Sequence, residues 1–181
     1  MKENRKFNKI FIRRILVILV FILTLLVIWR NDSVFRTYSE GANKLDMRFR
    51  YNAIDVYQLF KILGIVGRFL YIRYLCIDFV FIASFALVQN YILKWVMGKV
   101  MLNSRWRCLL YLSYFRALFD VTENILILIL LTSFPTELTW LVMVSSFATS
   151  LKFILLYLWL IAIPVSFFIR KKIGNLQRGV K

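Results

Sequence analysis

The chain has 181 residues, of which 61% are hydrophobic and 17% aromatic, and its formal net charge is +16. A soluble domain of this length cannot bury so much apolar surface in one core, so the composition indicates an integral membrane protein. The basic residues flank apolar runs, which favours membrane topology over nucleic-acid binding, and no nucleic-acid partner is expected. The sequence contains no histidine, the usual general base and transition-metal ligand, and we expect neither a metal site nor a cofactor.

The first apolar segment, about residues 10–29, follows a basic N-terminus. Residues 15–29 carry no charge, and with the preceding turn they approach the roughly 20 residues that a membrane-spanning helix needs. Arg13 and Arg14 would extend to the inner interface. Because no small-x-small cleavage pattern follows Trp29, an uncleaved first span is favoured over a signal peptide.

The polar connection of residues 30–69 is long for so small a protein. Its second half indicates a short amphipathic helix, because Asn52 and Asp55 are typical of a helix start and apolar residues then recur at helical spacing. Gly64 and Gly67 interrupt this pattern. We therefore expect a helix at the outer membrane surface that turns at the glycines into the second span. It is either a solvated connector or a lid over the bundle.

Three further spans are predicted at about residues 70–93, 108–132 and 138–169. With the first span they make an all-α, integral membrane four-helix bundle, a single domain over residues 1–181. The fourth span is longer than a bilayer requires, so it should tilt or project inward, and Pro164 would kink it.

The distribution of basic residues predicts the orientation of the chain. The N-terminus, the 94–107 loop and the C-terminal tail to Lys181 are basic and nearly free of acids, whereas the 133–137 turn has no Lys or Arg. Short basic loops stay in the cytoplasm, so we expect both termini there and the protein in the plasma membrane. The outer segment dilutes its basic residues with Asp32, Glu40, Asp46 and Asp55. An aromatic belt is predicted from Trp29, Trp95, Trp106 and Trp140 at the span ends.

Five ionisable residues fall inside the predicted spans: Asp78, Arg116, Asp120, Glu123 and Lys152. A charge at mid-bilayer costs about 2.5–3.5 kcal/mol on insertion scales, so each should face the bundle interior and find a partner. Asp120 and Lys152 lie at matching depth on adjacent spans, and we expect an ion pair between them. Arg116 could instead extend toward the inner interface.

Helical spacing arranges the polar residues in two stripes. The third span carries Arg116, Asp120, Glu123 and Asn124 at i, i+4, i+7 and i+8, and the fourth carries Ser145, Thr149 and Lys152. Two basic residues balance two of the three acids, and the carboxyl left over favours transport or acid catalysis. Polar contacts that only hold helices together are the alternative interpretation.

Two short motifs stand out: D-x-x-E-N, made by Asp120, Glu123 and Asn124, and T-x-x-K, made by Thr149 and Lys152. With them go Asp55-Val-Tyr, Leu63-Gly64, Gly67-Arg68, Tyr71 and Asp78-Phe79. Through these features, residues 50–155 resemble an uncharacterised family of small bacterial four-span membrane proteins. The resemblance implies the same four-span frame and selects the same polar residues, but it implies no activity.

Three functions agree with these patterns. The first is a protein that binds or moves a lipid, an amphiphile or a proton through its intramembrane polar site. The second is a membrane-embedded lipid-modifying enzyme with a carboxyl as general acid. The third is a structural, accessory or immunity-type protein without a ligand site. The candidate site residues are Asp78, Asp120, Glu123, Asn124, Thr149 and Lys152, with Arg116 and Ser145 weaker. Expected partners are membrane lipids, a second copy of the chain or another membrane protein.

Overall fold

The computed structural model describes residues 2–102 and 105–178, and this part of the chain is helical and contains no strand. The elements in order are α1 (Lys2–Tyr38), η1 (Leu45–Met47), α2 (Ala53–Leu102), η2 (Arg105–Leu110), α3 (Tyr111–Ser133) and α4 (Thr139–Arg178). By length and composition α1, α2 and α4 could each cross a membrane, whereas the three charged residues of α3 keep it outside that group. The predicted tail residue Lys181 lies outside the described residues, as do the side chains of residues 2–8, 99–102 and 173–178.

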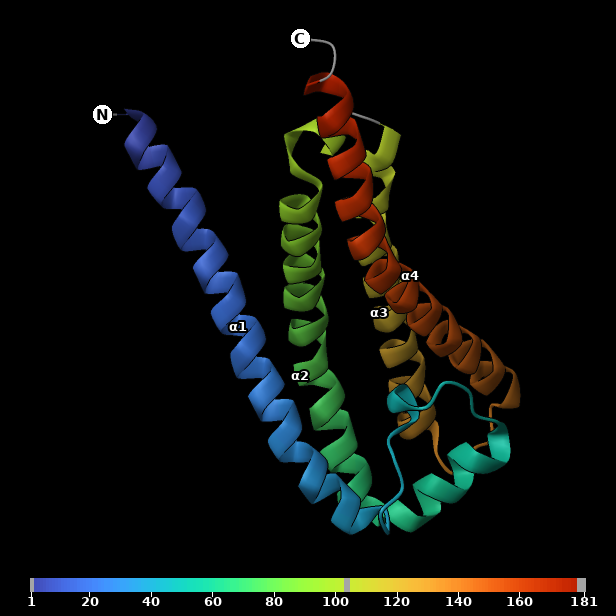
Figure 1. Cartoon of the computed structure of the whole chain (residues 1–181). Coiled ribbons are helices and arrows are strands. Elements are labelled where there is room, and N and C mark those ends of the chain that lie inside the picture. Colours follow the sequence, from blue (N-terminus) through green and yellow to red (C-terminus); the bar gives the residue numbers. More distant parts are fainter. Residues whose placement is uncertain (1, 103–104, 179–181) are drawn as a thin grey trace.

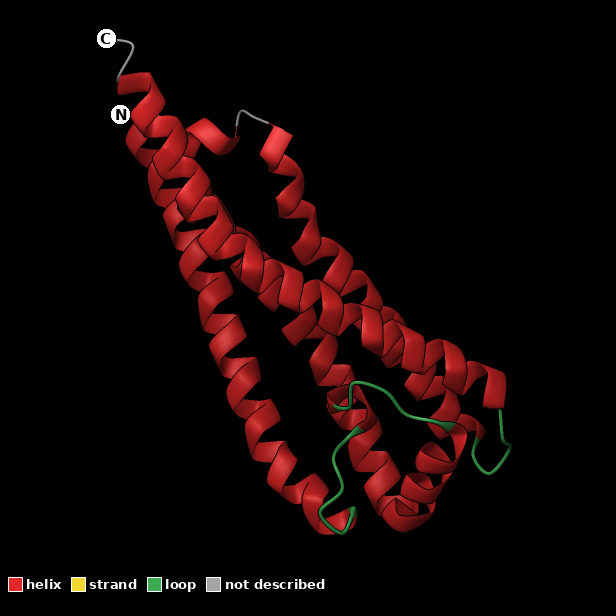
Figure 2. Ribbon diagram, turned by 45° about the vertical axis from the view of Figure 1, so that its right-hand side comes forward, coloured by secondary structure: helices red, strands yellow, loops and turns green. Residues whose placement is uncertain are grey.

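The four helices alternate in direction, and the bundle therefore has two distinct ends (Figure 1). The terminal end is where α1 begins and α4 ends. The loop end holds residues 39–64 and the turn between α3 and α4, and Figure 2 shows loops gathered there. α1 packs along α2, while α3 and α4 pack against each other and against α2. α4 continues through Pro164 and changes direction along its length (Figure 1), as expected where a proline removes a helical hydrogen bond.

The predicted amphipathic helix is present as the first turns of α2. Its backbone begins beside a reciprocal cap, in which Asn52 Oδ1 accepts from the Asp55 N–H and Asp55 Oδ2 accepts from the Asn52 N–H, both at 2.9 Å. It crosses the loop end in a different direction from the rest of α2 (Figure 1). The apolar face identified from the sequence is the buried one: Val56, Leu59, Phe60 and Leu63.

The turn between this helix and the long part of α2 lies at Gly64, whose φ of 60° and ψ of −168° a glycine adopts without strain. Gly67 does not break the helix, contrary to the prediction. A Cβ there would lie 3.1 Å from the Cβ of Tyr38 and 3.0 Å from that of Leu63. Gly67 therefore lets the end of α1 approach α2 closely.

Residues 39–52, which we call the inserted segment, enter the bundle from the loop end. Its contacts include a partly buried ion pair, in which Lys44 Nζ lies 2.6 Å from Asp32 Oδ1 of α1. They also include buried hydrogen bonds: Tyr71 of α2 donates to Asp46, and the Tyr51 N–H donates to Ser146 Oγ of α4 at 3.0 Å. The segment thus contacts α1, α2 and α4, and η1 within it also lies against α3. No sequence pattern predicted its entry.

Two hydrophobic cores divide the bundle. The larger lies at the loop end and joins residues of α1, the inserted segment, α2, α3 and α4: Phe35, Leu45, Tyr51, Val56, Tyr57, Leu59, Phe60, Leu63, Tyr71, Tyr74, Leu75, Ile127, Leu130, Leu131, Leu141 and Val142. The smaller lies toward the terminal end around Leu93, Met97, Leu110, Trp159 and Ala162. The most apolar stretch of α1 contains no fully buried residue, although one of its faces is half-buried, with Phe21 stacked on Phe81 and Phe85 of α2.

Candidate functional site

The two predicted polar stripes meet in the middle of the bundle. On α3, Arg116, Asp120, Glu123 and Asn124 are all at most 6% exposed. On α4, Ser145, Thr149 and Lys152 are at most 8% exposed. The polar faces of the two helices are therefore directed at each other and away from the apolar outer faces, which agrees with the stripe prediction.

The predicted Asp120–Lys152 ion pair is present, and it belongs to a longer chain of charges. Lys152 Nζ lies 3.0 Å from Asp120 Oδ1 and 2.5 Å from Glu123 Oε2, while Arg116 Nη1 lies 2.7 Å from Asp120 Oδ2. Lys152 thus bridges two carboxylates, and Asp120 bridges two cations. Removing either central residue would leave a buried charge without its partner.

Arg116 is buried and does not extend to the interface, which corrects the alternative prediction. Its Nε donates to Gln89 Oε1 of α2 at 2.9 Å, and its guanidinium lies over the Phe85 ring, 4.4 Å from the centroid. Its Nη2 has no hydrogen-bond partner among the described residues. Gln89 is a site residue that the sequence analysis missed, because an amide in an apolar helix carries no charge to draw attention.

A hydroxyl network joins α3 and α4 to the inserted segment. Thr149 donates to Glu123 Oε1 at 2.5 Å, and the Tyr51 hydroxyl lies 2.6 Å from Ser145 Oγ and 3.3 Å from Thr149 Oγ1. Burial, together with the nearby Glu123 carboxylate, raises the pKa of Tyr51 above its usual value. Tyr51 therefore keeps its proton at neutral pH, and its hydroxyl group covers this side of the site through hydrogen bonds to Ser145 and Thr149. The sequence analysis did not identify it.

Asp78 has a single hydrogen-bond donor in the described structure. Asn124 Nδ2 donates to Asp78 Oδ2 at 2.7 Å, and Asp78 is 5% exposed. Among the described residues no cation forms an ion pair with this carboxylate, which contrasts with the doubly paired Asp120. Asp78 therefore matches the surplus acid that charge counting predicted.

Asp46 is a further buried acid, and the inserted segment carries it into the site. The hydroxyl groups of Tyr71 and Tyr74 donate to its two carboxylate oxygens at 2.9 and 2.7 Å. From the sequence it was counted only as an acid of the outer connection. Its place in a long polar stretch offered no signal, although the unusual length of that stretch did indicate a role.

A cavity of about 270 Å³ opens where these groups meet. Its charged lining is Asp46, Asp78, Arg116, Asp120 and Lys152, and its other lining side chains are Leu25, Ile28, Met47, Tyr74, Phe81, Phe153 and Leu156. Three acids thus face two bases, and Glu123 behind Lys152 makes four acids against two bases. The site combines an excess of negative groups with an apolar border contributed by α1, α2 and α4.

No family model, curated protein sequence or solved structure matches the chain. Among the described residues, no group of three or more Cys, Asp or Glu side chains is arranged to hold a metal ion. The site is defined by its own charged and polar side chains. It can pair with an ammonium group, donate hydrogen bonds from Arg116 and Lys152, and hold protons on surplus carboxyls.

Proposed function

We propose that the protein crosses the plasma membrane four times, with α3 as a span in addition to α1, α2 and α4, and with both termini in the cytoplasm. In support, the charges of α3 are buried against α2 and α4, so its outer face is apolar. α1 begins and α4 ends at the same end of the molecule (Figure 1). The exposed rings of Trp29 and Trp140 lie toward the loop end, and that of Trp95 lies toward the terminal end, as two aromatic belts would require.

On this topology the loop end is extracytoplasmic. Residues 53–63 would then form the predicted amphipathic helix over the outer end of the bundle, and the inserted segment would seal the site beneath it. Basic residues at the terminal end, such as Arg107 and Arg170, would face the cytoplasm. Membership of the four-span family that the chain resembles is part of the same proposal.

The function that the geometry supports best is binding of a membrane amphiphile, with its headgroup in the interior cavity. The observation that supports this proposal is a cavity lined by more acidic than basic side chains and bordered by apolar side chains of α1 and α4. Its volume of about 270 Å³ lies near the lower end of small-molecule pockets, roughly 300–1,000 Å³. It suits a headgroup, while the attached chain would follow Leu25, Phe153 and Leu156.

The charge excess indicates the class of headgroup. Asp120 and Glu123 are paired with Lys152 and Arg116, whereas Asp46 and Asp78 receive only neutral donors. An ammonium group between Asp46 and Asp78 would supply one of the two missing positive charges. Protons on these two carboxyls would balance the charge as well, so proton binding is the second candidate function.

Native mass spectrometry of the gently solubilised protein tests the proposal. Asp78→Asn keeps the shape of the side chain and its contact with Asn124 but removes the charge. We expect a discrete amphiphile adduct on the wild type that weakens at least about tenfold in this variant. Glu137→Gln, an exposed acid at the loop end, is the matched control and should retain the adduct.

Four other outcomes are informative. Equal adducts on wild type and Asp78→Asn would overturn amphiphile binding at this site. If the wild type carries no amphiphile adduct but shows an infrared band of a protonated carboxyl, and Asp78→Asn removes that band, proton binding would replace amphiphile binding as the proposed function. A wild type with neither an adduct nor this infrared band would indicate that the polar residues have a structural role. Turnover of a lipid that Asp120→Asn abolishes in a folded protein would instead establish the enzyme.

A further inference from the structure

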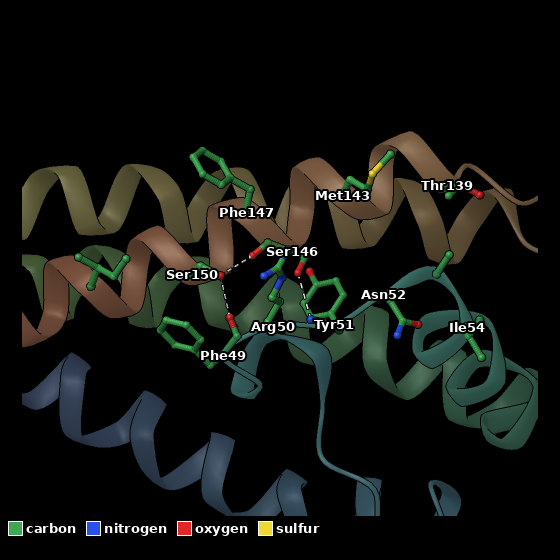
Figure 3. Close-up of a pocket in the computed structure, with 12 residues that line it drawn as sticks. Phe49, Arg50, Tyr51, Asn52, Ile54, Thr139, Met143, Ser146, Phe147 and Ser150 are labelled. Atoms are coloured by element: carbon green, nitrogen blue, oxygen red, sulfur yellow. Dashed lines mark hydrogen bonds between the residues drawn. The ribbon is translucent and has the colours of Figure 1, made fainter.

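A second hollow lies outside the interior cavity, between the inserted segment and α4. It is a groove of about 920 Å³ lined by Phe49, Arg50, Tyr51, Asn52, Ala53 and Ile54 on one side and Thr139, Met143, Ser146, Phe147, Ser150 and Ile154 on the other. Figure 3 shows the two rows beside each other, with Ser146 and Ser150 of α4 directed toward Phe49 and Tyr51. None of the charged residues of the interior site lines it.

Hydrogen bonds between the two sides hold the groove in shape. The Tyr51 N–H donates to Ser146 Oγ at 3.0 Å, and Ser150 Oγ donates to the Phe49 carbonyl at 2.9 Å (Figure 3). These bonds bind the extended backbone of the inserted segment to α4. The groove is therefore preformed, and an occupant would not have to order it.

Most of the groove surface is apolar and uncovered. Met143 and Phe147 of α4 are each 64% exposed, and Ile54 is 67% exposed. Such a surface on a tilted helix that begins beside Trp140 fits a hydrocarbon chain running along α4 into the bilayer.

Arg50 supplies the one charge of this groove. It is exposed, its side chain extends toward α4 (Figure 3), and it makes no hydrogen bond or ion pair with any described residue. It lies level with Ser146 and Ser150, inward of Trp140 along the helix. A bare guanidinium at that level of a membrane is costly, whereas a phosphate would pair with it through two parallel hydrogen bonds.

We propose that this groove binds an anionic phospholipid of the outer leaflet, with its phosphate on Arg50 and an acyl chain along Met143, Phe147 and Ile154. The inference rests on the four-span topology proposed above. It is independent of the ligand in the interior cavity, because the two sites share no charged residue.

The test is native mass spectrometry of the full chain in detergent, titrated with phosphatidylglycerol. Arg50→Gln should weaken the highest-affinity phosphatidylglycerol adduct at least about tenfold, the effect of losing a charge-assisted hydrogen-bond pair. Lys61→Gln is the matched control, because Lys61 is also an exposed cation of the loop end and lies outside the groove. It should leave the adduct unchanged, and Arg50→Lys should restore part of the affinity.

Equal binding by wild type and Arg50→Gln would overturn the proposal, as would an equal loss in Lys61→Gln, which would indicate unspecific attraction to basic charge. Binding of glycerophosphoglycerol as tightly as the whole lipid would show a phosphate site without a chain groove, and it would also overturn the proposal. Asp78→Asn separates the two sites. It should weaken the amphiphile adduct of the interior cavity and leave the phosphatidylglycerol adduct of the groove unchanged. The experiment therefore shows separately whether either proposal fails.

Discussion

The loop end and the terminal end of the bundle are built differently. At the loop end, α1, the inserted segment, the short helix of residues 53–63, α3 and α4 share one large core, and polar side chains bind the layers together. At the terminal end the core is small, none of the described side chains of α1 belongs to it, and the Arg170 guanidinium reaches the Val96 carbonyl near the end of α2.

This difference follows from what each end must cover. Apolar side chains are satisfied by lipid as well as by protein, so a loosely packed end costs little in a bilayer. Buried charges need partners in fixed positions, and water or lipid cannot replace them there. The more tightly packed part of the bundle accordingly lies around the buried charges and between them and the loop end. These charges are Asp46, Asp78, Asp120, Glu123 and Lys152.

The largest expected effect is at the centre of the site. Lys152→Met leaves Asp120 and Glu123 without their shared cation, and we expect a loss of about 3–5 kcal/mol of stability. Lys171→Met removes an exposed cation at the terminal end and should change stability by less than about 0.5 kcal/mol. Denaturant unfolding in mixed micelles measures both. Equal stability of the two variants would contradict the importance given to the charge chain.

A smaller effect should separate the two cores. Leu59→Ala opens a void in the large core, where Leu59 is 2% exposed, and should cost about 3 kcal/mol. Leu109→Ala truncates a partly buried residue packed on the small core and should cost less, about 1 kcal/mol. The same unfolding assay compares the pair. If Leu109→Ala proved the more damaging, the proposed contrast between the ends would be wrong.

The smallest effect tests the seal made by the inserted segment. Tyr51→Phe removes the hydroxyl that meets Ser145 and Thr149, and we expect a loss of about 1 kcal/mol together with faster amide exchange in residues 45–51. Tyr157→Phe alters an exposed ring on α4 and should change neither quantity. Hydrogen exchange followed by mass spectrometry gives both values. Unchanged exchange in Tyr51→Phe would show that the segment is held by its other contacts.

Helix positions and helix faces could be predicted from the sequence because both depend on neighbours three or four residues apart. The apolar runs predicted the long helices, and helical spacing predicted the buried stripe of α3 and the buried face of residues 53–63. Depth along antiparallel helices predicted the Asp120–Lys152 pair. The helix ends were less accurate, because α1 runs to Tyr38 and polar residues continue a helix as readily as apolar ones.

The inserted segment could not be predicted in this way. Its position depends on hydrogen bonds between residues nearly a hundred positions apart, such as Tyr51 with Ser145 and Ser146. No period or turn motif within residues 39–52 encodes those partners, so Asp46, Tyr51 and the groove beside Arg50 emerge only when the chain is packed. Local spacing determines which residues face inward. Which distant residues meet there depends on how the helices and the loop fill a common space.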